Sequence, residues 1–519
     1  MLTTASMRFA RCCALIAVVT GCATSSATTG ANAPAPTAGG STSRSALRQF
    51  IDSLIDVPEF RSTNWGVLVV DPGRGETLYA RNADKLFMPA SNQKLLTGST
   101  ALTQLGPDYR WSTTVLARGP IRDGELAGSL IVRGNGDPSM SAHMQRGDAL
   151  APMRAIADSL RAHGVTRIDG PLVAQSLFTD GQLGYGWSYD DLDASYSAGV
   201  DGLYFNEGFT EVVVYGGARA GDPVRAITRP ASTYPRLIIR ATTADRLANG
   251  ATVADTSTSR AITVAQDSSH TGVLVSGTIA AGDSAVVEIT FRDLGAAYLA
   301  ALREALTSRG IVVAPERAPP PGGATISGPT TTQLDSLFTL RSPTLREVLP
   351  FFEKPSQNQI GEILFKTLAL EKTGVGRADS ASRVVSRQLI AWGAQADGFA
   401  VRDGSGLSRH DYVSPRTIVT VLDAMRKSPN FKTFYDALPI AGVDGTIRSR
   451  MRNTAAMGNV HAKTGTLDKA RSLSGYVTTA DGRMLLFSAL CNNYVVPTRR
   501  VDMVSDALGV RLASMRLDP

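Results

Sequence analysis

Apolar residues in the first hundred positions switch between helical spacing and the patterns typical of strands. Spacings of three and four predict a helix over Leu47–Ile55, and β-branched and aromatic runs predict strands over Trp65–Val70 and Glu76–Ala80. The turn residues Asp71-Pro72-Gly73 join these strands as a hairpin. Leucines at helical spacing behind Pro89 predict a second helix that starts there. A hairpin that leads into a helix is a typical beginning of an α+β domain.

The middle of the chain has a different texture, because strands become short and frequent. Helical and strand patterns alternate over residues 106–209 and 290–315, whereas short strands dominate residues 210–289. We therefore expect a small β-rich module nested in an inserted α/β domain. The elements that this part of the sequence predicts are strands Leu130–Val132, Gly170–Ala174, Glu211–Tyr215, Arg236–Ala241, Ala261–Ala265, Gly272–Gly277, Ala285–Phe291 and Ile311–Val313, and helices Met153–His163 and Leu294–Arg309.

Helical patterns return after residues 316–329, a segment rich in proline and glycine that predicts a linker. The clearest later elements are a helix over Gln359–Leu370 and a strand over Leu473–Val477. An apolar run precedes Cys491, which is the only cysteine beyond residue 22. No disulfide framework is therefore expected, and a buried core position suits this cysteine.

The first 22 residues have the pattern of an export signal rather than of folded structure. The apolar run Cys12–Val19 follows two arginines and is too short to span a bilayer. It ends in Val19-Thr20-Gly21-Cys22, which resembles the lipobox of bacterial lipoproteins, in which the cysteine carries the lipid. Cleavage by an ordinary signal peptidase, which releases a soluble protein, is the alternative. Residues 23–44 are small and almost uncharged, as in a flexible tether.

Composition and charge limit the remaining possibilities. A chain of 519 residues is too long for one hydrophobic core, so two or more domains are expected. The net charge of +7 is spread thinly without a basic cluster, which argues against a nucleic-acid partner. The five histidines show no ligand spacing, so no metal site is expected. Ala23 after Cys22 lacks the acidic residue that favours inner-membrane retention in some bacteria, so the default expectation is a lipid anchor in the outer membrane.

The helix that follows Pro89 carries a serine and a lysine that can work together. Ser91 and Lys94 are three residues apart, so both lie on one face of the helix. A serine hydroxyl needs a base to become a nucleophile, and a lysine amine kept neutral can be that base. No Lys occurs between Lys94 and Lys354 although the chain has 53 basic residues, so Arg serves almost everywhere else. The alternative is a surface helix that contains this short pattern by chance.

Two further polar groups lie in the last third of the chain. Ser356-Gln357-Asn358 precedes the predicted helix Gln359–Leu370, where an N-cap cluster is the alternative to a catalytic role. Lys463-Thr464-Gly465-Thr466 precedes the predicted strand Leu473–Val477. Its glycine would let a ligand backbone approach a strand edge, and an ordinary edge strand with a protective lysine is the alternative.

The three groups, taken in order, resemble the motif set of penicillin-recognising serine enzymes: Ser91-x-x-Lys94, Ser356-x-Asn358 and Lys463-Thr464-Gly465. Flanking segments are similar to the D-alanyl-D-alanine carboxypeptidase/endopeptidase family called DacB or penicillin-binding protein 4, peptidase family S13. This resemblance covers about residues 45–510. The flanking segments that carry it are Phe87–Leu95, Gly134–Pro138, Asp403–Arg409 and Leu438–Thr446.

The resemblance implies a fold. It implies an α+β, penicillin-binding/β-lactamase-like serine transpeptidase domain, an antiparallel sheet with helices, built from residues 45–105 and 330–519. The long α/β and β-rich insertion between the first two motifs splits this domain, as the change in sequence texture also suggests.

The resemblance also implies a mechanism that needs no metal or organic cofactor. Ser91 attacks the penultimate D-Ala of a peptidoglycan D-Ala-D-Ala peptide and forms an acyl-enzyme, with Lys94 as base. β-Lactam antibiotics are expected to acylate the same serine as covalent inhibitors. Ser356 bridges Lys94 and Lys463 and passes the proton to the leaving amine. The other implied contacts are Asn358 to the substrate amide, Lys463, Thr464, Gly465 and Thr466 around the terminal carboxylate, and the N–H groups of Ser91 and Thr466 as an oxyanion hole.

Two other functions remain open at this point. A β-lactamase shares these motifs and this reaction class, although the long insertion and the flanking segments favour the carboxypeptidase. A non-catalytic peptidoglycan-binding lipoprotein would be expected to have lost one of the motif residues Ser91, Lys94, Ser356 or Lys463, and all four are present. The sequence does not separate carboxypeptidase from endopeptidase activity, because both cut a bond after a D-Ala.

One departure from the family pattern concerns substrate specificity. The family typically has an Asp, four residues before Phe178, that binds the charged end of the stem-peptide side chain, and here that position is Ala174. We hypothesise that Asp468 replaces this acid and that Arg409 holds a side-chain carboxylate beside it. The alternative is that Asp468 is a solvated turn residue beside Lys469.

Overall fold

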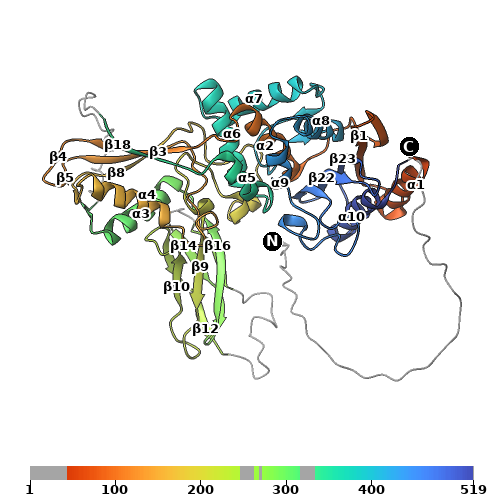
Figure 1. The fold of residues 1–519 in the computed structure, drawn as a ribbon. Coiled ribbons are helices and arrows are strands. Elements are labelled where there is room, and N and C mark those ends of the chain that lie inside the picture. Colours follow the sequence, from red (N-terminus) through yellow and green to blue (C-terminus); the bar gives the residue numbers. More distant parts are fainter. Residues whose placement is uncertain (1–43, 246–261, 268–271, 316–333, 518–519) are drawn as a thin grey trace, which may run out of the picture. The chain divides into compact units, whose positions relative to one another are not determined.

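The computed structural model describes residues 44–245, 262–267, 272–315 and 334–517 (Figure 1). The predicted signal (1–22), the tether (23–44) except its last residue, and the linker (316–329) lie outside the described residues. Among the helices that are described, none is long and apolar enough to cross a membrane. The described residues form an α+β fold, as predicted.

An antiparallel five-stranded sheet, in the order β2-β1-β23-β22-β21, forms the centre of the catalytic part. Its first two strands come from the predicted N-terminal hairpin and the other three from the last sixty residues, so the two ends of the folded chain meet in one sheet. The strands are β1 (Asn64–Asp71), β2 (Glu76–Arg81), β21 (His461–Leu467), β22 (Ala470–Thr478) and β23 (Met484–Asn492).

Both faces of this sheet are covered, because alternate residues of its strands enter two different hydrophobic clusters. Val67 and Val69 of β1 pack in the cluster that contains helices α1 (Arg44–Ile55) and α10 (Thr498–Ser514). Leu68, between them, faces the other cluster. That second cluster contains α2 (Gln93–Gln104), α5 (Leu345–Glu353), α6 (Asn358–Thr373), α7 (Ala378–Ala391), α8 (Pro415–Arg426) and α9 (Phe431–Ala437).

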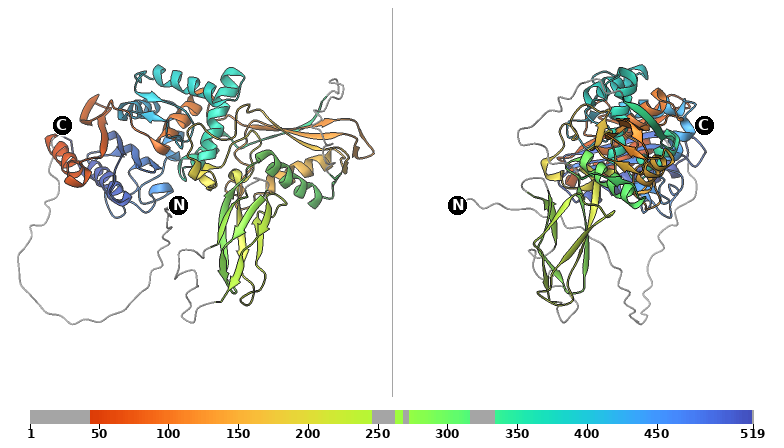
Figure 2. Two further views of the ribbon diagram at one scale, coloured as in Figure 1. Left: turned by 180° about the vertical axis from the view of Figure 1, so that it is seen from behind. Right: turned by 90° about the vertical axis from the view of Figure 1, so that its left-hand side faces the viewer.

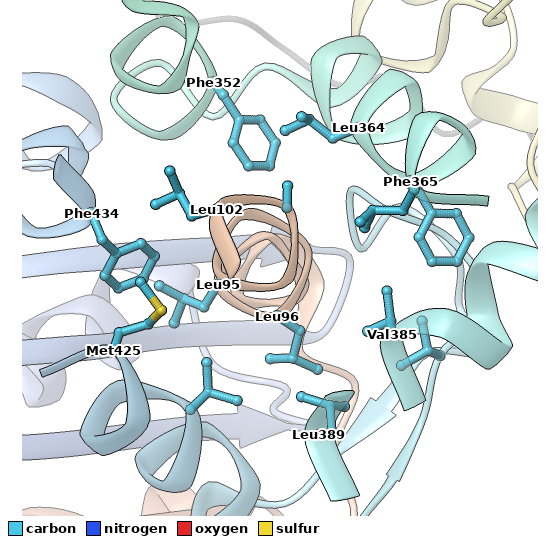
Figure 3. Close-up of a cluster of buried hydrophobic side chains, with 14 of the residues drawn as sticks. Leu95, Leu96, Leu102, Phe352, Leu364, Phe365, Val385, Leu389, Met425 and Phe434 are labelled. Carbon is cyan, nitrogen blue, oxygen red and sulfur yellow. The ribbon is translucent and has the colours of Figure 1, made fainter. Parts of the chain in front are cut away.

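Helix α2 lies inside this second cluster, and side chains from several helices surround it (Figure 3). Every residue from Gln93 to Leu102 is buried, including the polar ones. Its leucines contact a shell of large apolar side chains contributed by the later helices. A helix that is buried on all sides cannot shift relative to its neighbours, because the core around it is close-packed. The residues at its start therefore have fixed positions. The surrounding side chains labelled in the figure are Phe352, Leu364, Phe365, Val385, Leu389, Met425 and Phe434.

The inserted α/β part has a core of its own, in which helices α3 (Ala151–Ala162) and α4 (Leu294–Ser308) pack against two four-stranded sheets. The elements predicted over residues 106–209 and 290–315 are present, with ends shifted by one or two residues. The sheets have the orders β18-β3-β6-β8 and β17-β7-β5-β4. Their strands are β3 (Ser112–Arg118), β4 (Ile121–Arg122), β5 (Glu125–Leu126), β6 (Ser129–Gly134), β7 (Arg167–Ile168), β8 (Leu172–Ser176), β17 (Val312–Val313) and β18 (Asp335–Arg341).

One boundary differs from the prediction. Strand β18 lies beyond residue 330, where the catalytic part was expected to resume, yet it pairs with β3 of the inserted sheet. The pairing gives the edge of that sheet a partner for its backbone groups. The catalytic part therefore resumes after Arg341 rather than at residue 330.

The β-rich part has a small hydrophobic core of mostly valine and isoleucine side chains. Its strands form three small sheets, in the orders β10-β9-β16, β11-β14-β13 and β12-β15, and lie side by side in both views of Figure 2. The strands are β9 (Phe209–Tyr215), β10 (Arg225–Arg229), β11 (Arg236–Ile239), β12 (Thr242–Ala244), β13 (Thr263–Gln266), β14 (Gly272–Ser276), β15 (Thr278–Ala280) and β16 (Ser284–Thr290).

Two glycines allow the chain to pack tightly around the turn that precedes α2. Gly406 has φ of +83°, and a Cβ placed there would lie 1.8 Å from the carbonyl oxygen of Ala90. Gly465 of β21 lies against the same turn, since a Cβ would lie 2.5 Å from the carbonyl oxygen of Pro89. The close approach at Gly465, expected to involve a ligand backbone, therefore already involves the protein's own chain.

We expect Gly406→Ala to destabilise the protein by about 3–5 kcal/mol, because a left-handed conformation and a clash with the Ala90 carbonyl act together. Gly482→Ala is the matched control, since its φ is +86° and a Cβ there would have no neighbour within 4 Å. That control should lose only about 1–2 kcal/mol, the cost of the backbone conformation alone. Urea unfolding followed by tryptophan fluorescence measures both, and equal losses would contradict the steric argument.

Candidate active site

Ser91 lies in a short 3₁₀ turn, Ala90–Asn92, that leads directly into α2. Ala90 has φ of +48°, an uncommon conformation for a residue with a side chain, and such strain is typical of functional sites. Hydrogen bonds from the central sheet hold this turn on both sides. Asn92 Nδ2 donates to the Lys463 carbonyl at 2.9 Å, and Ser472 Oγ donates to the Pro89 carbonyl at 2.8 Å. The serine itself remains partly exposed.

Lys94 is fully buried, and its amine has three polar neighbours. Nζ lies 2.8 Å from Ser91 Oγ, 2.6 Å from Asn358 Oδ1 and 2.7 Å from the Ser405 carbonyl oxygen. Asn358 Oδ1 and the Ser405 carbonyl can only accept, so they engage two N–H bonds of the amine. A neutral amine then has its lone pair left for the hydroxyl proton of Ser91. The arrangement is that of a nucleophile with its base.

Burial is the main reason why Lys94 can be neutral. Desolvation, together with the nearby charge of Lys463, lowers the pKa of Lys94 to about 7, against the opposing effect of Asp403, Glu353 and Glu362. A base with a pKa near neutrality is deprotonated in a useful fraction of molecules and still accepts a proton readily.

The loop that contributes the Ser405 carbonyl is held by two buried carboxylates. Glu362 Oε1 of α6 accepts from the N–H groups of Ser405 at 2.8 Å and Gly404 at 3.1 Å. Asp403 Oδ1 accepts from Gly406 N at 2.7 Å, and its Oδ2 accepts from Ser408 N at 2.7 Å. Burial raises the pKa of Glu362 to about 8, and the charge of Asp403 adds to this.

Sequence reasoning did not assign roles to Glu362, Asp403 or the Ser405 carbonyl. The segment Asp403–Arg409 was recognised only as similar to the family. Its alternation of glycine, serine and aspartate is typical of a loop whose backbone N–H groups donate hydrogen bonds to the aspartate. This pattern was the feature of the sequence from which the role of Asp403 could have been predicted.

The second motif lies where α5 is followed by α6, beside Lys94. Asn358 Nδ2 donates to the Tyr196 carbonyl at 2.7 Å while Oδ1 accepts from Lys94, so both ends of this amide have protein partners. Ser356 has φ of +66°. Its buried Oγ has no hydrogen-bond partner within the part of the chain that the structure describes. The predicted bridge from Ser356 to Lys94 and Lys463 is therefore not formed here, although the serine lies two residues from a lysine-bound asparagine.

The third motif is the strand β21, which the prediction placed before the strand Leu473–Val477. Lys463 is fully buried, and its Nζ donates a hydrogen bond to the Thr464 carbonyl at 3.3 Å. Thr464 Oγ1 donates to Thr446 Oγ1 at 2.7 Å, and Thr466 is exposed. Burial lowers the pKa of Lys463, and the charge of Glu353 opposes this.

The inserted part contributes backbone and side-chain groups to the same site. Trp187 Nε1 donates to Asp403 Oδ2 at 3.0 Å, and Arg409 N donates to the Gly186 carbonyl at 3.2 Å. The Tyr196 carbonyl accepts from Asn358. The insertion therefore helps to hold two of the loops around Lys94, a role that its composition did not reveal.

Within the described residues, no hydrogen bond or ion pair joins the side chains of the predicted specificity residues Asp468 and Arg409. Asp468 and Lys469 form the two-residue turn between β21 and β22, and Asp468 is exposed without an ion-pair partner among the described residues. This geometry is that of the solvated turn residue considered as the alternative. Ala174 lies on β8 and packs against Gly295 at the start of α4. Arg409 is partly buried beside the inserted segment.

Comparison with known proteins agrees with the geometry. Residues 47–513 match the model of the D-Ala-D-Ala carboxypeptidase 3 (S13) family. The chain is 34% identical over 483 residues to a D-alanyl-D-alanine carboxypeptidase of Actinomadura sp. (strain R39), covering 90% of this chain and 84% of that protein. It is 26% identical over 442 residues to D-alanyl-D-alanine carboxypeptidase DacB of Haemophilus influenzae, covering 83% and 86%.

A solved structure supports the fold. The crystal structure of penicillin binding protein 4 (dacB) from Haemophilus influenzae superposes with a TM-score of 0.72 at 24% identity, covering 89% of this chain and 98% of the other. At this identity the likeness concerns the fold.

The depressed pKa of Lys94 predicts how Ser91 reactivity depends on pH. Only the neutral amine accepts the hydroxyl proton, so the acylation rate of Ser91 by a fluorescent penicillin should rise with pH through about 7. Below that pH the rate should fall about tenfold per unit, following the fraction of neutral amine. The arginine of Lys94→Arg cannot lose its proton. This variant should therefore show almost no acylation, and its rate should not rise with pH. A rate independent of pH between 5 and 8 in stopped-flow measurements would show that Lys94 is not the base.

Proposed function

The chain belongs to the D-Ala-D-Ala carboxypeptidase 3 (S13) family, and on that premise we propose that Ser91 is the nucleophile with which it acts on peptidoglycan stem peptides. It is a serine-type D-alanyl-D-alanine carboxypeptidase. The observation that carries the residue assignment is the 2.8 Å contact between Ser91 Oγ and a fully buried Lys94 Nζ. A chance surface pattern would not bury the lysine.

The first half-reaction forms an ester on Ser91. Lys94 Nζ takes the hydroxyl proton while Oγ bonds to the carbonyl carbon of the penultimate D-Ala. The bond from that carbon to the nitrogen of the terminal D-Ala then breaks, and Lys94 Nζ gives the proton to the leaving amine. The N–H groups of Ser91 and Thr466 are the proposed donors to the oxyanion. The close contact between Gly465 of β21 and the turn before Ser91 supports this choice of two donors, because it brings the strand of Thr466 next to Ser91.

The second half-reaction is hydrolysis. A water attacks the ester carbonyl, Lys94 accepts its proton, and the peptide leaves with a new carboxylate while Ser91 regains its hydroxyl proton. Asn358 accepts a hydrogen bond from Lys94 in this structure. We therefore assign it two roles, which are to position the base and to contact the substrate amide.

Recognition of the terminal carboxylate is assigned to β21. Lys463 supplies the buried cation, and the hydroxyls of Thr464 and Thr466 supply donors on the same strand. A charge-assisted hydrogen bond of this kind contributes about 1.5–3 kcal/mol. Lys463→Arg should therefore be milder than Lys94→Arg, because carboxylate binding needs a cation and not a base.

β-Lactam antibiotics are the proposed covalent inhibitors, since their strained amide presents the same carbonyl to Ser91. Penicillin binding protein 4 of Haemophilus influenzae has been solved in complex with a β-lactam. Endopeptidase activity on cross-links is proposed together with carboxypeptidase activity, because both cleave after a D-Ala. A β-lactamase is the competing function, and it would release the penicillin rapidly.

The proposed location is the periplasm, with a lipid on Cys22 and residues 23–44 as the tether. The lipobox-like sequence Val19-Thr20-Gly21-Cys22 supports the anchor, and Ala23 favours the outer membrane. The substrate is in the same compartment.

Ser91→Ala tests the catalytic assignment. Wild type should bind fluorescent penicillin in a one-to-one covalent complex and release D-Ala from a D-Ala-D-Ala peptide, whereas Ser91→Ala should do neither. Because Ser91 is partly exposed and the substitution is small, the circular dichroism spectrum and melting temperature should stay unchanged. Peptide hydrolysis by the variant at the wild-type rate would overturn the assignment, and rapid turnover of penicillin by wild type would favour the β-lactamase.

Cys22→Ser tests the anchor. The variant should move from the membrane fraction to the soluble periplasmic fraction with its penicillin labelling intact, because the tether is far along the chain from Ser91. Metabolic labelling with a fatty-acid analogue should mark wild type only. If the wild-type protein is not labelled, Cys22 carries no lipid and residues 1–22 are an ordinary signal peptide.

A further inference from the structure

Glu353 is a buried carboxylate for which the mechanism above has no use. It is the last residue of α5 and has no exposed surface. Both of its carboxylate oxygens are buried, and neither has a hydrogen-bond partner among the residues that the structure describes. An unpartnered carboxylate in a protein interior costs several kcal/mol, on the order of the penalty for any buried charge without compensation. Such a group needs an explanation.

The carboxylate lies against α2, one helical turn beyond Lys94. A Cβ placed on Gly98 would lie 2.8 Å from Glu353 Oε1. Gly98 is four residues after Lys94 in the same helix, so the two residues share a face. A glycine inside a helix costs about 1 kcal/mol relative to alanine. Here its missing side chain is what leaves room for the carboxylate.

Two cations act on this carboxylate. Burial raises the pKa of Glu353, while the charges of Lys463 and then Lys94 oppose the rise. In return, the charge of Glu353 is the one that supports the protonated form of Lys463 against burial. Lys94 has two further acidic neighbours, Asp403 and Glu362.

The other charged groups near α5 are already paired. Lys354, the next residue, forms an ion pair with Asp444 at 2.6 Å, and Lys432 pairs with Asp436 on α9. Lys366 on α6 pairs with Asp180 at 2.8 Å. Glu353 is therefore left to the two lysines of the site.

The reaction requires these two lysines to differ in charge. Lys94 must be neutral to accept a proton, whereas Lys463 must be a cation to hold a carboxylate. Their hydrogen bonds favour the opposite distribution, because Lys94 has three polar neighbours and Lys463 has one. Something else must keep the proton on Lys463.

We propose that Glu353 is a positioning carboxylate that keeps Lys463 protonated while Lys94 is neutral. This inference rests on the proposed function. Ionised Glu353 and cationic Lys463, both buried, together carry no net charge, and this balance leaves Lys94 as the group that gives up its proton. Without the carboxylate, Lys463 loses its proton at a lower pH and the terminal carboxylate of the substrate loses its cation.

The test is the pH profile of kcat/KM for a D-Ala-D-Ala peptide with Glu353→Gln, which keeps the shape and removes the charge. Glu353 favours the protonated form of both lysines, so its loss should move both limbs of the profile to lower pH by about one unit. On the alkaline side kcat/KM should therefore fall about tenfold, mainly through KM, and near pH 6 it should rise about fivefold, because a larger fraction of Lys94 is then neutral. Glu353→Asp, which keeps the charge, should restore the wild-type limbs. Asp436→Asn, at an exposed position of α9, is the control for loss of a carboxylate outside the site and should leave the profile unchanged.

A uniform fall of kcat/KM at every pH, with both limbs in place, would overturn the proposal, because a merely structural residue acts in that way. If Glu353→Gln fails to fold, Gly98→Ala displaces the carboxylate from the other side and should produce the same acid shift, and unmoved limbs in that variant overturn the proposal equally. Failure of the proposed function is distinguishable, since wild type itself would then not be labelled by penicillin at Ser91.

Discussion

The burial of one amine is the constraint on which this structure depends. Lys94 has no exposed surface, yet the proposed mechanism requires it to exchange a proton with a serine that is partly exposed. Desolvation is what brings the pKa of Lys94 to about 7, and desolvation requires a helix surrounded by the core on all sides. The packing of α2 is therefore part of the chemistry. Any change that admitted water to this helix would restore an ordinary lysine.

The same constraint explains why so many buried polar groups gather near α2. A buried amine needs acceptors, and these come from an asparagine side chain and from a loop carbonyl. The loop in turn needs Glu362 and Asp403 to satisfy its N–H groups, and Asp403 accepts from a tryptophan of the inserted part. The hydrogen bonds thus form a continuous network from Lys94, through the loop and Asp403, to the inserted part. This makes the long insertion part of the catalytic site rather than an appendage.

Charge balance gives the site its second level of organisation. Two buried lysines repel each other, and the buried acids around them decide which one keeps its proton. Glu353 stands out among these acids, because Glu362 and Asp403 have backbone donors whereas its own oxygens have none among the described residues. A helix glycine on the facing side gives it room.

The sequence by itself determined the features that are local or that depend on the order of motifs. The i, i+3 spacing of Ser91 and Lys94 already placed both on one helix face, and the helices and strands that the apolar patterns predicted are present to within a few residues. The family followed from three motifs in order. Only the tertiary structure decided which groups touch the amine, because Asn358 and Ser405 are 264 and 311 residues away from Lys94 along the chain. No local pattern encodes contacts across such distances. For the same reason β18 joined a sheet that its position in the sequence did not suggest, and Asp468 became a turn residue.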